Sequence, residues 1–172
     1  MDAGHIRARG SSSLKGPLFY WGPLVVWLVA IFVFSGDALS AHHTSSIIEP
    51  AIRWMLPNAS PATVYGVHVA VRKVGHVLEY GLLGLLAFRA LRSGRPESFR
   101  PAWAVGAVCI GAAYALTDEF HQSFVASRTG TVSDAVIDLA GCFGSVVLLS
   151  WWRLRGDRRR AESGRTADGA RS

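Results

Sequence analysis

The stretch RKVGHVLEYG, residues 72–81, carries ionisable side chains inside an apolar segment that runs from about Val67 to Leu91. A segment of about 20 mostly apolar residues is long enough to cross a bilayer as a helix. At about 100° per residue, the polar side chains of this stretch share one face of that helix; they are Lys73, His76, Glu79 and Tyr80. An ionisable group at mid-membrane costs about 2.5–3.5 kcal/mol, so it normally faces other helices and has a partner there.

Three further apolar segments are present, at about Pro17–Phe34, Ala102–Leu116 and Val132–Trp152. Half of the 172 residues are hydrophobic and 17% are charged. Such long apolar blocks predict an all-α polytopic membrane protein. We expect a four-helix transmembrane bundle over residues 17–152, with the third helix continuing through 118–122. Residues 1–16 are expected to form a cytoplasmic tail, and 153–172 a disordered basic cytoplasmic tail.

The first apolar segment has a second interpretation, as a cleaved signal peptide. It follows basic residues, and Ala38-Leu39-Ser40 offers small residues at cleavage spacing. The segment is longer than the usual apolar region of about 7–15 residues. We therefore expect an uncleaved first helix, and the orientation is the same in either case.

The basic residues predict how the chain is oriented. Most of the 18 Lys and Arg residues lie before residue 17, between 89 and 100, or after 152. Cytoplasmic loops carry the excess of Lys and Arg, so both termini are expected in the cytoplasm. The loops 35–65 and 118–131 then face outward. Because the arginines flank apolar segments, the net charge of +6 does not indicate nucleic-acid binding.

The first outer loop contains apolar residues at nearly helical spacing from Ile47 to Leu56, between Ser45-Ser46 and Pro57. This pattern predicts a short helix. Two placements are open: an interfacial helix on the outer leaflet, or a helix packed over the outer end of the bundle.

The third and fourth helices also carry polar groups near their outer ends. Asp118 and His121 are three residues apart, as are Glu119 and Gln122, and Asp134 and Asp138 are four apart. With the predicted orientation, three helices bring polar groups to the outer half of the bilayer. We interpret them as an outward-opening pocket; a buried network that only holds the helices together is the alternative.

Histidine beside carboxylate suits general acid–base chemistry, because histidine titrates near neutral pH. The candidate catalytic residues are His76, Glu79, Glu119 and His121. The candidates for binding an anionic substrate are Lys73, Tyr80, Gln122 and Arg128. Arg72, Asp118, Asp134 and Asp138 would support them, although Arg72 also suits an interfacial anchor.

These residues include the ligand types of a two-histidine, one-carboxylate metal site. The two candidate histidines, His76 and His121, come from different predicted helices, and no HExxH motif is present. We therefore predict no metal ligands, and the residues leave the cofactor unknown.

The combined pattern resembles the VanZ-like family, which is named after a teicoplanin-resistance protein. The matching motifs are Arg72-Lys73-x-x-His76-x-x-Glu79-Tyr80, Asp118-Glu119-x-His121-Gln122, Arg128, and Asp134-x-x-x-Asp138-x-x-Gly141. One departure is Asp138, where the family often has asparagine. The resemblance covers about 35–152 and implies a small bacterial membrane protein, linked in some members to glycopeptide resistance. It implies no particular reaction.

The resulting hypothesis is a multi-pass protein of the bacterial cell membrane, surrounded by membrane lipids, that binds or modifies an anionic cell-envelope component. An envelope precursor or an anionic lipid headgroup is the expected ligand. A non-catalytic scaffold or shielding protein is the first alternative. A proton-coupled transporter, with His76 and Glu79 as the relay, is the second.

Overall fold

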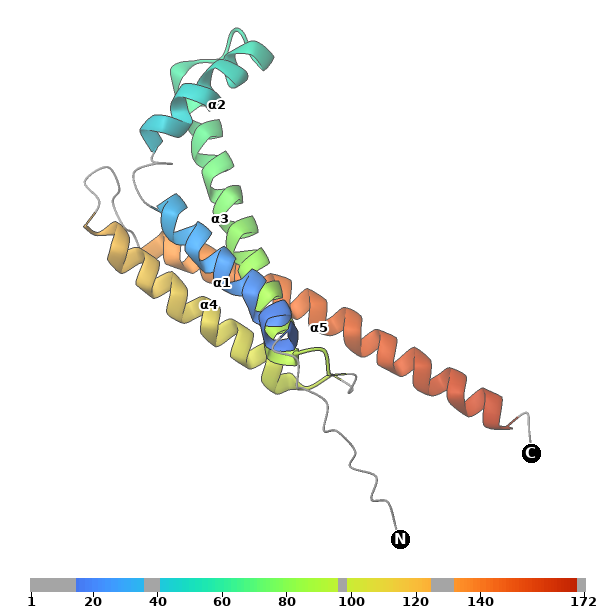
Figure 1. The fold of residues 1–172 in the computed structure, drawn as a ribbon. Coiled ribbons are helices and arrows are strands. Elements are labelled where there is room, and N and C mark those ends of the chain that lie inside the picture. The colour runs from blue at the N-terminus through green and yellow to red at the C-terminus, as the bar shows by residue number, and fades with distance from the viewer. Residues whose placement is uncertain (1–14, 36–40, 96–98, 125–131, 170–172) are drawn as a thin grey trace.

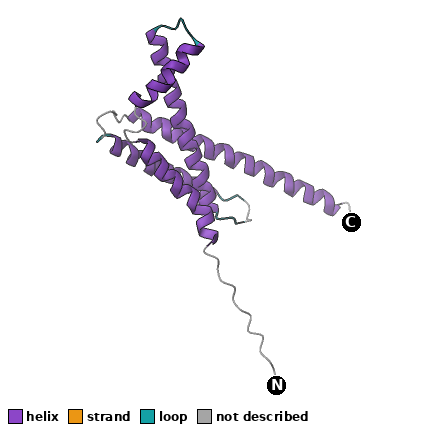
Figure 2. Cartoon of the chain, turned by 45° about the horizontal axis from the view of Figure 1, so that its top comes forward, coloured by secondary structure: helices purple, strands orange, loops and turns teal. Residues whose placement is uncertain are grey.

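The computed structural model describes residues 15–35, 41–95, 99–124 and 132–169. The regular elements within these ranges are all helices, as Figure 2 shows. They are α1 (Lys15–Ser35), α2 (Ala41–Met55), α3 (Pro61–Arg92), α4 (Pro101–Gln122) and α5 (Val132–Gly169). The predicted continuation of the third apolar helix through residue 122 is confirmed.

Three helices in the described ranges are long and apolar enough to cross a membrane. The spans are Gly16–Val33 in α1, Pro61–Arg92 in α3 and Ser133–Arg160 in α5. Their outward faces are strongly apolar, as expected of surfaces covered by lipid acyl chains; Leu18, Val26 and Leu148 are examples. The chain is therefore a helical membrane protein.

Helices α3, α4 and α5 pack against one another, and α1 packs against α3 and α4 (Figure 1). Helix α3 contacts all the other helices, and α5 runs antiparallel to α4. Side chains from all four packed helices form the apolar core. Its largest members include Ile31 from α1, Tyr80 and Phe88 from α3, Trp103 from α4 and Val146 from α5.

Local sequence explains where α3 begins and ends. The Ser60 side chain accepts a hydrogen bond from the Thr63 amide, and Pro61 occupies the first turn, where its missing N–H costs nothing. At the other end, Ser93 and Gly94 have φ of 48° and 69°. These left-handed conformations stop the helix immediately after Arg92.

The backbones of two helices approach closely where α5 crosses α3 at Gly141. A Cβ atom added to Gly141 would lie 2.4 Å from the carbonyl oxygen of Val77. Four residues further along α5, Ser145 donates a hydrogen bond to the Gly81 carbonyl at 2.9 Å. Small residues that allow such backbone contact are typical of helix packing in membranes.

The helix expected in the first outer loop is present as α2. It contacts α3 and stands beside the N-terminal part of that helix in Figure 1. Ile52 is buried, whereas Trp54 is 85% exposed and Met55 is also exposed. Among the described helices, α2 has its contacts with α3. These contacts do not match a helix packed over the end of the whole bundle, which was one of the two expected placements.

The expectation of a disordered tail from residue 153 is corrected by the structure, in which α5 continues through Gly169. Extending an existing helix requires no new nucleation. Arginine and alanine, which recur in 153–169, are good helix formers. Low hydrophobicity alone was therefore a poor guide to disorder here.

Candidate functional site

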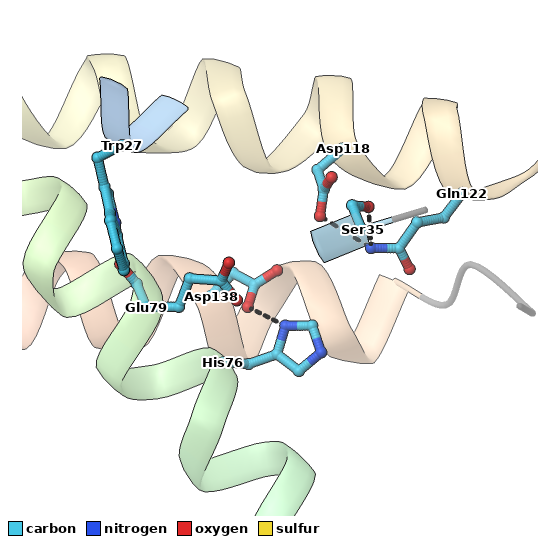
Figure 3. A network of polar contacts seen from close by, with 7 residues as sticks. All are labelled: Trp27, Ser35, His76, Glu79, Asp118, Gln122 and Asp138. Atoms are coloured by element: carbon cyan, nitrogen blue, oxygen red, sulfur yellow. Dashed lines mark hydrogen bonds and ion pairs between the residues drawn. The ribbon is translucent and has the colours of Figure 1, made fainter. Parts of the chain in front are cut away.

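The central feature of the site is a contact between α3 and α5. His76 Nδ1 lies 3.1 Å from Asp138 Oδ1, and Figure 3 shows the imidazole beside the carboxylate. The Asp138 side chain is completely buried, and the His76 side chain is 18% exposed. One turn further along α5 is Gly141, whose contact with the Val77 backbone brings the two helices close enough for this pair.

A second polar group connects α4 with α1. Gln122 Nε2 donates to Asp118 Oδ2 at 2.8 Å and to Ser35 Oγ at 2.9 Å (Figure 3). All three side chains are buried. Both donors of the Gln122 amide are thus used within the protein. The predicted role of Gln122 as an anion ligand would require one of these hydrogen bonds to be exchanged for one to the substrate.

Tyr80 and Glu79 follow His76 on the same helix, α3. Tyr80 is fully buried, and its hydroxyl lies in the electrostatic field of Asp118, Asp138 and Glu79. The backbone carbonyl of Glu79 accepts a hydrogen bond from Trp27 Nε1 at 3.0 Å (Figure 3). The three helices α3, α4 and α5 therefore bring their acidic side chains into one region.

The remaining polar residues of α4 point to different neighbours. Glu119 is half-buried, and the charges that act on it come from Asp134, Asp138, Asp118 and His76. His121 is stacked on Phe32 of α1, with ring centroids 4.3 Å apart. Asp118 therefore interacts with Gln122, whereas the histidine predicted to share its face contacts α1.

The predicted cationic residues lie nearer the N-terminal end of α3. Lys73, one turn before His76, is exposed, and Arg72 is half-buried. Arg128 lies outside the described residues. The deep part of the site is therefore rich in carboxylates, and the described cations are at its edge.

Several buried polar atoms have no hydrogen-bond partner among the described residues. They are Tyr80 OH, Asp118 Oδ1, Glu119 Oε1, His121 Nδ1 and Asp138 Oδ2. A buried polar atom without a partner costs about 1–3 kcal/mol. Ionised carboxylates only accept hydrogen bonds, so these oxygens suit water or a ligand that supplies hydroxyl or amino donors. No group of three or more metal-ligating side chains is found in the described ranges.

The contribution of α1 was missed by sequence reasoning. Trp27, Phe32 and Ser35 all contact the site, yet they belong to a segment without charge. The usable signal was Trp27, because an indole N–H deep in an apolar helix needs an acceptor from another element. Nothing in the sequence indicated which acceptor that would be.

Gln122 bridges Asp118 and Ser35 through two hydrogen bonds, and this bridge can be tested by its effect on stability. We expect Gln122→Leu to lower the free energy of unfolding by about 1–3 kcal/mol, because Asp118 Oδ2 loses its donor while staying buried. Reversible unfolding of the purified protein in mixed detergent micelles measures this change. Ser123→Ala, at the exposed neighbouring position, is the control and should change stability by less than about 0.5 kcal/mol. An equally small effect of Gln122→Leu would contradict the bridge.

Comparison with known proteins adds one identification. The family model described as VanZ/LLP1 matches residues 20–153, which is most of the chain and includes all the site residues discussed above. Neither the comparison with curated proteins nor that with solved structures finds a match. The earlier resemblance is confirmed by this match: the chain belongs to the VanZ/LLP1 family.

Proposed function

We propose that α1, α3, α4 and α5 all cross the bacterial cell membrane, with both termini in the cytoplasm. The packing of α4 against α3 and α5 supports a crossing by that helix too, since its polar residues are concentrated at its last turn. The basic residues before 17, between 89 and 100 and after 152 support the orientation. The exposed Trp54 and Met55 support a position of α2 at the outer interface.

This topology predicts opposite labelling of two engineered cysteines. In a background with Cys109→Ala and Cys142→Ala, we expect a membrane-impermeant maleimide to label Asn58→Cys in intact cells. Arg158→Cys should react only after the membrane is permeabilised. The background without added cysteine is the control, and labelling of Arg158→Cys from outside would contradict the orientation.

We further propose that the polar site binds a headgroup of an envelope component and supplies general acid–base catalysis for a covalent change of that headgroup. The observation that carries this proposal is the His76–Asp138 pair, in which a fully buried carboxylate holds one ring nitrogen of a partly exposed imidazole. A carboxylate in this position orients the imidazole for proton transfer to or from a ligand.

The distribution of charge suggests which headgroup fits. Lys73 and Arg72, at the edge, suit an anionic group such as a phosphate. The acceptor oxygens of Asp118, Glu119 and Asp138 suit hydroxyl or amino groups deeper in the site. A lipid-linked sugar or amine headgroup with an anionic linkage combines both features.

The direct experiment uses the full chain reconstituted in lipid nanodiscs and incubated with a lipid extract of bacterial envelopes. Mass spectrometry of the recovered lipids is expected to show a headgroup species that is converted to a new mass. Retention of that species without conversion would favour the scaffold or shielding alternative. Recovery of the extract unchanged and unbound would overturn the proposal. In cells, the corresponding phenotype to measure is teicoplanin sensitivity with and without the protein.

A proton-coupled transporter is the second candidate, supported by the number of acidic groups gathered from three helices. The charges of Asp118, Asp134 and Asp138 all act on Glu119, and chains of buried carboxylates and histidine are typical of proton relays. Liposomes that contain the protein and a pH-sensitive dye separate the two functions. Proton movement driven by a gradient, without lipid conversion, would favour transport.

A further inference from the structure

A cavity of about 430 Å³ lies at the C-terminal end of α3, away from the polar site near the middle of that helix. Its walls come from three helices and the turn after α3, and they include Tyr20 of α1, Phe88 and Arg92 of α3, and Leu149 and Arg153 of α5. From His76 to Arg92 is 16 residues, or about 24 Å along a helix. The cavity is therefore separate from the site described above.

Three arginines line this cavity together with apolar side chains: Arg89, Arg92 and Arg153. Arg89 is held in place, since it donates to the Tyr20 carbonyl at 3.2 Å and its guanidinium lies 4.7 Å from the centre of the Phe19 ring. Arg92 and Arg153 form no ion pair with any described residue. Arg153 Nε is also buried without a hydrogen-bond partner in the described part of the chain.

The charges around Arg153 are mostly of its own sign. Arg92 and Arg160 repel it, and Asp157 attracts it. The Asp157 carboxylate is itself engaged by the Phe99 amide at 3.2 Å. Holding like charges together at a partly buried place is unfavourable unless an anion neutralises them. The guanidinium donors are of the kind that binds phosphate oxygens in a bidentate manner.

The apolar part of the wall narrows the choice of anion. Leu85, Phe88 and Leu149 line the same cavity as the arginines, and Tyr20 lies against Gly94 at its edge. Basic cavities between membrane helices, with apolar side chains next to them, are suited to the headgroup and upper acyl chain of an anionic lipid. A small inorganic anion would use only the arginines.

We propose that this cavity, at the arginine-bearing end of the bundle, binds a phosphate-bearing anion, with Arg92 and Arg153 as its principal ligands. An anionic phospholipid satisfies the polar and the apolar part of the wall together. The site is independent of the proton chemistry proposed around His76.

Native mass spectrometry of the full chain in detergent tests the proposal, with phosphatidylglycerol, phosphatidylcholine and inorganic phosphate as separate probes. We expect phosphatidylglycerol to bind, and the double variant R92Q/R153Q to bind it at least about tenfold more weakly. The matched control R95Q/R158Q removes the same net charge at exposed positions outside the cavity, and its affinity should stay within about twofold of the unmodified protein. The variant R92K/R153K keeps the charge but not the planar donors, so intermediate affinity is expected.

Each outcome either distinguishes a lipid from free phosphate as the ligand or contradicts the proposed anion site. Binding of phosphatidylglycerol over phosphatidylcholine, lost in R92Q/R153Q only, identifies a lipid ligand. Binding of inorganic phosphate with the same dependence on the two arginines identifies free phosphate. Equal loss in both double variants would show that only overall charge matters and would overturn the proposal, as would undiminished binding by R92Q/R153Q. Thermal unfolding of each variant shows whether a loss comes from misfolding.

Discussion

Gly141→Ala is expected to destabilise the protein by about 3 kcal/mol, near the upper end of what one added methyl group costs in a packed interior. The new Cβ would lie 2.4 Å from the carbonyl oxygen of Val77, 2.9 Å from its Cα and 3.0 Å from its carbonyl carbon. All three are backbone atoms, which cannot turn aside as the end of a side chain can. Relief therefore requires α3 and α5 to move apart along their whole contact.

Gly144→Ala is the matched control on the same helix. A Cβ there meets nothing within 4 Å, so stability should be unchanged or slightly raised by the better helix propensity of alanine. Unfolding in mixed micelles with increasing denaturing detergent compares the two variants. If Gly141→Ala were as stable as Gly144→Ala, the close crossing of α3 and α5 would be disproved.

The same crossing explains what could be predicted of the site from sequence. The polar face of α3 follows from the spacing of His76, Glu79 and Tyr80, because helical periodicity fixes which side chains share a side. Periodicity within one helix does not determine which residue of another helix lies opposite. The pairing of His76 with Asp138 depends on the depth at which Gly141 meets Val77, which is a property of packing.

Helix α1 shows more clearly that the sequence of one helix does not determine its partners on another. Its sequence is apolar on every side, so no stripe indicates which face is buried. Ser35 and Phe32 reach Gln122 and His121 only because α1 lies alongside α4. Sequence reasoning grouped Gln122 with the candidate ligands, and it could not indicate that one of its partners, Ser35, belongs to a helix that carried no polar signal.

The segment after residue 152 shows a different limit of sequence-based prediction, which concerns disorder. Polar composition without apolar periodicity predicted disorder after residue 152, and this prediction was wrong for the residues through Gly169. Composition measures how much surface a segment can bury, which decides whether it folds alone. A segment joined directly to a membrane helix can continue that helix by propagation, and local propensity then decides.

His76→Gln is expected to lower the rate of headgroup conversion by about 10²–10⁴-fold, the usual contribution of a general acid–base group. Glutamine has a similar length and still forms hydrogen bonds, but it cannot exchange a proton near neutral pH. Because Lys73 and the buried carboxylates remain, the headgroup should still be retained. Conversion and retention are both read from the lipids recovered after incubation in nanodiscs.

Asp138→Leu tests the partner of the same pair. It removes the carboxylate that lies 3.1 Å from His76 Nδ1, so the imidazole loses the group that orients it, and a similar fall in conversion is expected. His68→Gln, two turns earlier on α3, replaces the same residue type outside the pair and should leave conversion within about twofold. Since the two helices meet at Gly141, unfolding measurements on all three variants separate a loss of chemistry from a loss of packing. If His76→Gln and His68→Gln converted the headgroup equally well, the His76–Asp138 pair would be a structural contact between α3 and α5, and the acid–base function would have to be abandoned.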